Sequence, residues 1–231
     1  MKKNNQEKIF IGIDLGGKKK ATTGLCILET KQGKPQFFLE YCRLCKDIKA
    51  TEILKTIKPY LEKTEVIAID GLLTIGKGKG LMRLYEKFLS TKIFRKERVN
   101  PLPPALLPKL SLAGRELVEK LKKYGFVLDK NLIETFPTLI KKLTEYSNIL
   151  ESVGITGNLS CQTENQKSAL ICAILSYLHS QFKTRYLGYK DGFLFLPEMS
   201  FWKKEWRQKF YQAWVSKDKL KYRYLITNIF K

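Results

Sequence analysis

Three short apolar segments that each end at an acidic residue constrain the fold of this chain most. The segments are residues 8–14, 65–70 and 131–134, and their last residues are Asp14, Asp70 and Glu134. Apolar runs of this length are typical of strands that are buried on both faces of a sheet. Helical patterns separate the three segments, so the sequence predicts an α/β fold with parallel strands at its centre.

Two more strands are predicted between the first two of these segments. Residues 22–28 and 36–42 have strand character, and Gln32-Gly33-Lys34-Pro35 between them is a turn signal. Helical spacing marks residues 48–61, 110–124 and 168–179, and a hairpin is predicted over 186–196. We therefore expect a mixed five-stranded sheet flanked by helices, with strands 1–3 antiparallel and strands 1, 4 and 5 parallel.

The last part of the chain differs from the rest in composition. Residues 198–231 contain all three tryptophans and a net charge of +6, from nine basic and three acidic residues. We predict one domain over residues 1–197 and a basic, Trp-rich extension over 198–231 that packs on it. Four aromatic residues of the extension recur at a spacing of four, namely Trp202, Trp206, Phe210 and Trp214. Such a stripe packs a terminal helix on its domain, or it stacks nucleic-acid bases.

The charge of the chain points to a polyanionic partner. It has 43 lysine and arginine residues against 22 acidic residues, a net charge of +21. A field of this sign attracts polyanions and speeds their association. Nucleic acid is the commonest such partner, and an anionic membrane surface or solubility alone are the other interpretations.

Apolar segments, cysteines and histidine limit where the protein is located and which chemistry it can use. No apolar run approaches the roughly 20 residues of a membrane helix, and no signal peptide precedes the first strand. Five cysteines, an odd number, argue against a disulfide framework, and one histidine, His179, excludes most histidine-based catalysis. We expect a cytoplasmic protein without a membrane partner.

The three strand-end acids are the candidates for chemistry. Ligands bind beyond the carboxyl ends of strands in open α/β sheets, so Asp14, Asp70 and Glu134 are expected to converge there. Oxygen ligands without histidine or cysteine favour Mg²⁺ or Mn²⁺, and such ions promote phosphodiester hydrolysis. The alternative is that these acids cap helices or pair with the many lysines.

Six motifs follow one another over residues 8–197. They are Ile11-Gly-Ile-Asp14-Leu-Gly-Gly17 with Thr23-Gly24-Leu25, Ile67-Ala-Ile-Asp70, Gly80-Leu-Met-Arg83-Leu-Tyr-Glu86, Ile133-Glu134-Thr-Phe-Pro137, Ser168-Ala-Leu-Ile-Cys-Ala173 and Gly192-Phe-Leu-Phe-Leu-Pro197. In this order and spacing they resemble the domain-of-unknown-function 429 family of predicted RNase H-like nucleases.

The resemblance implies an RNase H-like fold, distantly similar to RuvC-type Holliday-junction resolvases, and divalent-metal nuclease chemistry. It implies that Asp14, Asp70 and Glu134 are catalytic metal ligands on the first, fourth and fifth strands. Arg83 and Glu86 match an Arg-x-x-Glu helix motif, which we interpret as an ion pair at the rim of the site.

The chain departs from RNase H-like nucleases at the last helix, where a final acid is usual. Ser168 stands at that position and Asn165 lies three residues before it, so we expect both to support the site. Glu164, one turn before Ser168, shares its helix face and is the candidate for a fourth catalytic carboxylate.

Basic residues near the predicted site are expected to contact nucleic acid. They lie in two glycine-containing segments and at the start of the helix that follows: Lys18, Lys19, Lys20, Lys77, Lys79 and Arg83.

Two other functions remain open from the sequence. A non-catalytic nucleic-acid binder would keep the fold and charge but lose the chemistry through Ser168. A sugar-kinase-like ATPase would use the Asp14-Leu-Gly-Gly17 turn to approach phosphate. Against the ATPase, Gly76 to Gly80 lacks the Gly-Lys-Ser/Thr of a P-loop.

The net charge generates a prediction about binding. Affinity for DNA or RNA should fall with salt by a log–log slope of several units, because each neutralised phosphate contributes about 0.7–0.9. Titrations at a series of salt concentrations measure this slope. A flat response, or no retention on heparin at low salt, would contradict a nucleic-acid partner.

Overall fold

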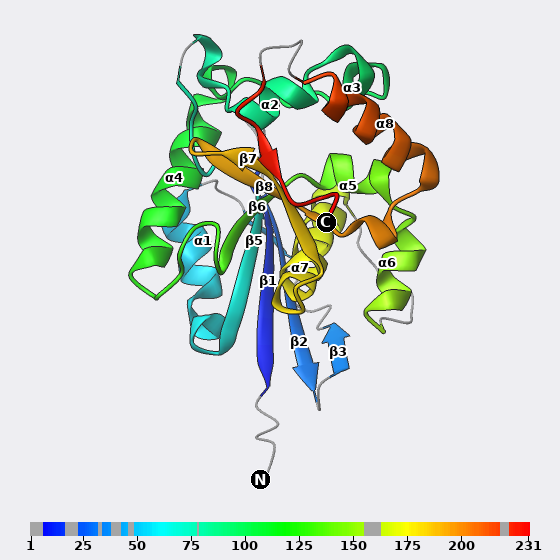
Figure 1. The fold of residues 1–231 in the computed structure, drawn as a ribbon. Helices are drawn as coiled ribbons and strands as arrows, with labels where there is room; N and C mark the ends of the chain where they lie inside the picture. The colour runs from blue at the N-terminus through cyan, green and yellow to red at the C-terminus, as the bar shows by residue number, and fades with distance from the viewer. Residues whose placement is uncertain are drawn as a thin grey trace.

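The structure, a computed structural model, describes most of the chain. The described residues are 7–16, 23–31, 34–37, 43–45, 49–77, 79–154, 163–217 and 222–231. They form a larger and a smaller β-sheet with helices around them (Figure 1). The protein has an α/β architecture, as the sequence predicts.

Six described strands make up the larger sheet. They are β1 (Lys8–Asp14), β2 (Thr23–Lys31), β3 (Lys34–Phe37), β4 (Arg43–Cys45), β5 (Thr64–Asp70) and β6 (Leu132–Thr135). Their order is β3–β2–β1–β5–β6, and β4 also pairs with β2. Strands β1 to β3 are antiparallel, whereas β1, β5 and β6 are parallel. The predicted strand directions, and the placement of β5 beside β1, are confirmed.

The predicted number of strands is wrong. The third strand was expected over 36–42, but β3 and β4 are separate pieces that pair with opposite ends of β2, and residues 38–42 lie outside the described part. A second sheet contains β7 (Thr184–Tyr189), β8 (Gly192–Pro197) and β9 (Ile226–Thr227). The β7–β8 hairpin is the predicted one. A two-residue strand such as β9 has no measurable periodicity, so the sequence pattern does not reveal it.

Strand β1 is covered on both faces, which explains its uninterrupted apolar sequence. Ile11 and Ile13 belong to an apolar cluster with α1 (Ala50–Ile57) and α4 (Pro108–Lys122). Phe10 lies on the other face, in a cluster with α7 (Glu164–Ser180). Because side chains alternate along a strand, one sequence contributes to two cores.

The remaining described helices surround this centre. They are η2 (Lys58–Lys63), η3 (Lys79–Leu81), α2 (Leu84–Leu89), α3 (Lys92–Lys96), η4 (Pro104–Leu106), α5 (Pro137–Leu143), α6 (Tyr146–Ser152), η5 (Met199–Phe201) and α8 (Lys204–Val215). The helices over 48–61 and 110–124 are thus present with shifted ends. Among the helices in the described ranges, none has both the length and the apolar character to cross a bilayer.

The aromatic stripe of residues 198–231 packs inside the molecule. Trp202, Trp206 and Phe210 are buried, and Trp214 is partly buried against the same apolar cluster that contains Phe10. The ring of Phe210 lies 5.6 Å from the rings of both Phe88 and Phe94. The stripe therefore packs a helix on the body and is not exposed for base stacking. The predicted domain boundary at residue 197 stays a prediction.

Close contact between α7 and β1 generates a stability prediction. A Cβ on Gly12 would overlap the carbonyl oxygen of Ala169 and the backbone nitrogen of Ala173, and neither can move without shifting the helix. Gly12→Ala should lower the free energy of unfolding by about 3 kcal/mol or more in urea denaturation. Gly125→Ala is the matched control, because open space surrounds that glycine and its φ of +86° costs only about 1–2 kcal/mol. Equal losses in the two variants would contradict the packing.

Candidate functional site

Two predicted site residues, Asp14 and Asp70, lie opposite each other at the carboxyl ends of adjacent parallel strands. They are direct partners in the β1–β5 pairing, and paired residues of parallel strands present their side chains on the same face. Phe10 on β1 and Ala68 on β5 place this face toward α7. Asp14 is 9% exposed and Asp70 is half-buried, so both carboxyl groups are largely removed from water.

Burial and mutual repulsion perturb both carboxyl groups. Burial raises the pKa of Asp14 from 3.8 to about 7, and the positive charge of Lys141 acts against this rise. The pKa of Asp70 lies well above its ordinary value, first through burial and then through the negative charges of Asp14 and Glu134. Two carboxylates held together in this way are stabilised in their charged forms by a bound cation.

The third predicted ligand, Glu134, is not in register with Asp14 and Asp70. In the β5–β6 pairing Asp70 is opposite Thr135, while Glu134 is opposite Ile69. Since a one-residue offset turns a side chain to the other face of a sheet, Thr135 occupies the place on β6 that the acids occupy on β1 and β5. Sequence reasoning missed Thr135 because the ends of strands do not reveal their register.

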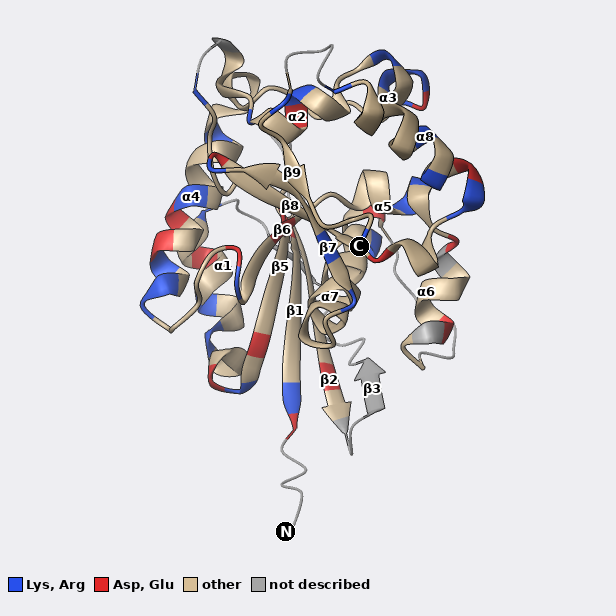
Figure 2. Cartoon of the chain, in the orientation of Figure 1, with Lys and Arg blue, Asp and Glu red and all other residues tan. Residues whose placement is uncertain are grey.

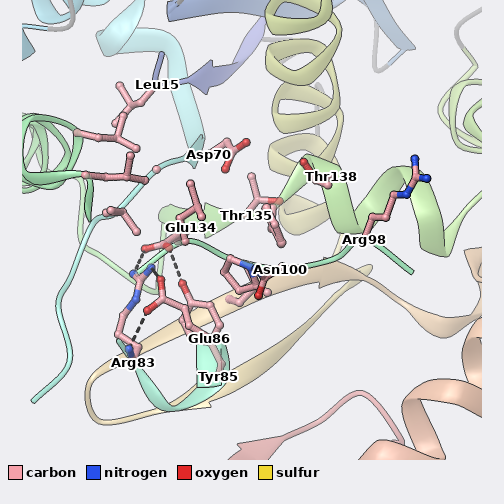
Figure 3. Close-up of a pocket in the computed structure, with 18 residues that line it drawn as sticks. Leu15, Asp70, Arg83, Tyr85, Glu86, Arg98, Asn100, Glu134, Thr135 and Thr138 are labelled. Carbon is pink, nitrogen blue, oxygen red and sulfur yellow. Dashed lines mark hydrogen bonds and ion pairs between the residues drawn. The ribbon is translucent and has the colours of Figure 1, made fainter. Parts of the chain in front are cut away.

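Glu134 is instead held in a buried cluster with Arg83, Tyr85 and Glu86 (Figure 3). Arg83 Nη1 and the backbone N–H of Leu73 donate to its Oε2, and the Tyr85 hydroxyl donates to its Oε1. Burial raises the pKa of Glu134, and Arg83 and Tyr85 act against that rise. Both carboxylate oxygens accept hydrogen bonds inside the cluster, and a role for Glu134 as a metal ligand stays a prediction.

Arg83 requires a correction. The sequence predicts that Arg83 contacts nucleic acid, but the residue is 1% exposed. Its guanidinium forms ion pairs with the carboxylates of Glu86 and Glu134. Arg83 Nη2 donates to Glu86 Oε1 over 2.6 Å, and the Arg83 backbone N–H donates to Glu86 Oε2 over 2.7 Å. The predicted ion pair between Arg83 and Glu86 is therefore present, inside the protein at the start of α2.

The remaining predicted residues, Glu164, Asn165 and Ser168, lie on α7, and a residue that the sequence analysis missed approaches them from α5. Lys141 on α5 reaches α7, where its Nζ lies 3.2 Å from Glu164 Oε2 and 3.3 Å from Ser168 Oγ. Glu164 is 72% exposed at its side chain and also pairs with Lys167 over 2.8 Å. Asn165 is half-buried and packs its backbone carbonyl on Gly24. A lysine ammonium therefore stands beside Ser168, where RNase H-like nucleases were expected to have an acid.

The position of Lys141 in the sequence is a signal that could identify it. It lies one turn into the helix that begins directly after β6. A long side chain at such a position can return to the end of the same strand, and Lys141 acts electrostatically on both Asp14 and Asp70.

The predicted nucleic-acid-binding lysines are only partly placed. Lys18, Lys19 and Lys20 lie outside the described residues. Lys77 is exposed, and Lys79 belongs to the 3₁₀ turn η3. Lysine and arginine residues are spread over several helices and strands (Figure 2).

The site offers oxygen ligands for one divalent cation. Within the described part of the chain, no three His, Cys, Asp or Glu side chains gather closely enough to hold an ion, so the predicted three-carboxylate centre is not formed. Asp14 and Asp70 remain as hard ligands, and Thr135 Oγ1 beside them is buried without a hydrogen-bond partner among the described residues. This donor set suits one Mg²⁺ or Mn²⁺ better than zinc.

Comparison with protein-family models, with curated proteins and with solved structures finds no match to this chain.

The raised pKa of Asp14 generates a prediction. Between about pH 4 and 7 the folded protein holds a proton that an unfolded chain with an aspartate pKa of 3.8 releases. Metal-free stability should therefore fall as pH rises through this window, by at most about 1.4 kcal/mol per pH unit for this group. Asp14→Asn should remove the contribution of this group to the fall, while the raised pKa of Asp70 still contributes. At pH 8, Mg²⁺ should raise the Tm of the wild type but not of the variant.

Asp129→Asn is the matched control for the metal response. Burial also raises the pKa of Asp129, to about 6, but Asp129 precedes β6 and lies outside the Asp14–Asp70 pair. This variant should keep the Mg²⁺-dependent rise in Tm. An equal Mg²⁺ response in both variants would contradict a cation at the pair.

Proposed function

We propose that this chain has an RNase H-like fold and is a divalent-metal-dependent nuclease that hydrolyses phosphodiester bonds in DNA or RNA. The observation that carries the proposal is the Asp14–Asp70 pair, two largely buried carboxylates in register at the carboxyl ends of adjacent parallel strands. Binding sites in open α/β sheets lie at such ends, and a bound cation would stabilise two adjacent carboxylates in their charged forms.

The arrangement around the pair supports the fold assignment. An antiparallel β1–β2–β3 unit continues into parallel β5 and β6, and α7 covers β1, β2 and β5. This is the order expected from the resemblance to RNase H-like nucleases.

The residues of the chain have separate tasks in the proposed reaction. Asp14 and Asp70 would hold Mg²⁺ or Mn²⁺, which supplies charge neutralisation at the phosphate and activation of water. Lys141 carries a positive charge beside the pair and would attract the phosphate backbone. Without the cation, the two acids would repel a polyanionic strand, whereas the net charge of +21 attracts it over a longer range.

A second candidate function is a nucleic-acid binder with a degenerate RNase H-like site. The observation that favours it is the last helix, where Ser168 replaces the acid and the Lys141 ammonium lies 3.3 Å from its hydroxyl. A fixed ammonium could stand in for one metal ion and allow binding without hydrolysis.

Cleavage assays distinguish the two candidates. Asp14→Asn should reduce Mn²⁺-dependent cleavage of labelled DNA or RNA by about 10²–10³-fold, the effect of losing one electrostatic group in an active site. Its affinity for the strand should stay unchanged or increase, because a negative charge near the phosphates is lost. Asp129→Asn makes the same chemical change outside the Asp14–Asp70 pair and should leave cleavage nearly unchanged.

The opposite result supports the binder. In that case the wild type shows no metal-dependent cleavage of any nucleic acid, and Ser168→Asp confers some.

A further inference from the structure

A cavity of about 310 Å³ opens directly beside Asp70. Its lining comes from four main parts of the chain: the segment after β5, the start of α2, the stretch before and into α4, and the turn from β6 into α5 (Figure 3). Proteins bind small molecules in cavities of about 300 Å³ and more. The cavity therefore suits one ring system of nucleotide size, and a duplex cannot enter it.

The walls of the cavity are mainly apolar. They include the side chains of Leu72, Leu107, Leu110, Phe136 and Leu194. Leu72 and Leu194 are buried, and the Phe136 ring is half-buried. Apolar walls with one aromatic ring favour a flat, weakly hydrated heterocycle over a sugar or a phosphate.

Two buried polar atoms in the lining have no hydrogen-bond partner among the described residues. They are Thr135 Oγ1 and Arg83 Nε, in side chains that are 2% and 1% exposed. Nearly all buried polar groups in proteins are paired, so two in one cavity require an explanation. The Thr135 hydroxyl both donates and accepts, so it can pair with either kind of group on the edge of a base.

The mouth of the cavity is polar. Asn100, Thr138 and Arg98 line it and are exposed. Arg98 has a φ of +60°, in the left-handed region, and its side chain points away from the Arg83 cluster (Figure 3). A cation there is suited to the sugar–phosphate backbone of a ligand whose base lies inside.

We propose that this cavity binds one unpaired base of a nucleic-acid strand whose neighbouring phosphodiester lies at Asp14 and Asp70. The substrate class is then single-stranded or locally unpaired DNA or RNA, because a base in a duplex must first leave its stack. The inference rests on the proposed nuclease function. Thr135 connects the two sites, since it is opposite Asp70 in the sheet and also lines the cavity.

A single-stranded oligonucleotide with one 2-aminopurine, titrated without divalent metal, tests the cavity. The fluorescence of this base changes when it leaves the stack of its neighbours. Thr138→Trp fills the mouth from an exposed position, so it should weaken binding of the single strand at least fivefold and abolish the fluorescence change. Thr56→Trp, on the exposed face of α1, is the matched control and should change neither.

Thr135→Val tests the unpaired hydroxyl with little change of shape. It should weaken binding of the single strand while leaving the Tm unchanged or higher, because no hydrogen bond of the free protein is lost. Thr30→Val is the control, since that buried hydroxyl donates to the Lys8 carbonyl. The control should lower the Tm without affecting binding.

The outcomes separate the cavity from the nuclease. The base-binding cavity would be overturned if Thr138→Trp and Thr135→Val bound the single strand with the fluorescence change of the wild type. It would also be overturned if the wild type bound duplex and single strand with equal affinity. Mn²⁺-dependent cleavage could persist in either case. If Thr138→Trp loses the fluorescence change and Thr56→Trp keeps it, the result supports base binding in the cavity. This holds even if the wild type cleaves no nucleic acid and the nuclease proposal fails.

Discussion

The buried ion pair between Arg83 and Glu134 is the interaction on which the surrounding structure depends. A guanidinium that is 1% exposed is stable only where carboxylates and hydrogen bonds compensate its lost hydration, and Glu134 and Glu86 do this. The same cluster joins distant parts of the chain. Arg83 Nη1 also donates to the Thr74 hydroxyl, which in turn donates to the Asp191 carbonyl in the β7–β8 turn. The backbone N–H of Leu84 donates to the Asp191 carboxylate. Removing one partner would leave an uncompensated charge, at a cost of about 3–5 kcal/mol.

The register of β6 separates Glu134 from the Asp14–Asp70 pair. With the oxygens of Glu134 occupied, the acids that remain at the carboxyl ends of the parallel strands are Asp14 and Asp70, on the face of α7. One face of the sheet edge thus carries a rigid charged cluster, and the other carries two acids with raised pKa values. The cavity lies between them, bounded by Asp70 on one side and Arg83 on the other.

Electrostatics connects these features with the composition. A net charge of +21 attracts polyanions, whereas Asp14 and Asp70, when both are charged, would repel a phosphate group near them. A divalent cation removes this repulsion, and Lys141 already reduces it. The proposed nuclease would need a divalent cation bound at Asp14 and Asp70, whereas the proposed binder would need only the ammonium of Lys141.

The sequence alone determined the α/β class, the strand directions and the Asp14–Asp70 pair, because long apolar runs specify strands buried on both faces and their ends meet at one sheet edge. The pairing of Arg83 with Glu86 was predicted from the resemblance to an Arg-x-x-Glu helix motif, and the structure contains this ion pair. Only the tertiary structure decided the register of β6, which turns Glu134 away and puts Thr135 beside Asp70. It also decided the burial of Arg83 and the approach of Lys141 to Ser168. Register and side-chain partners depend on contacts between residues far apart in the chain, and a shift of one residue reverses the face of a strand without changing its local pattern.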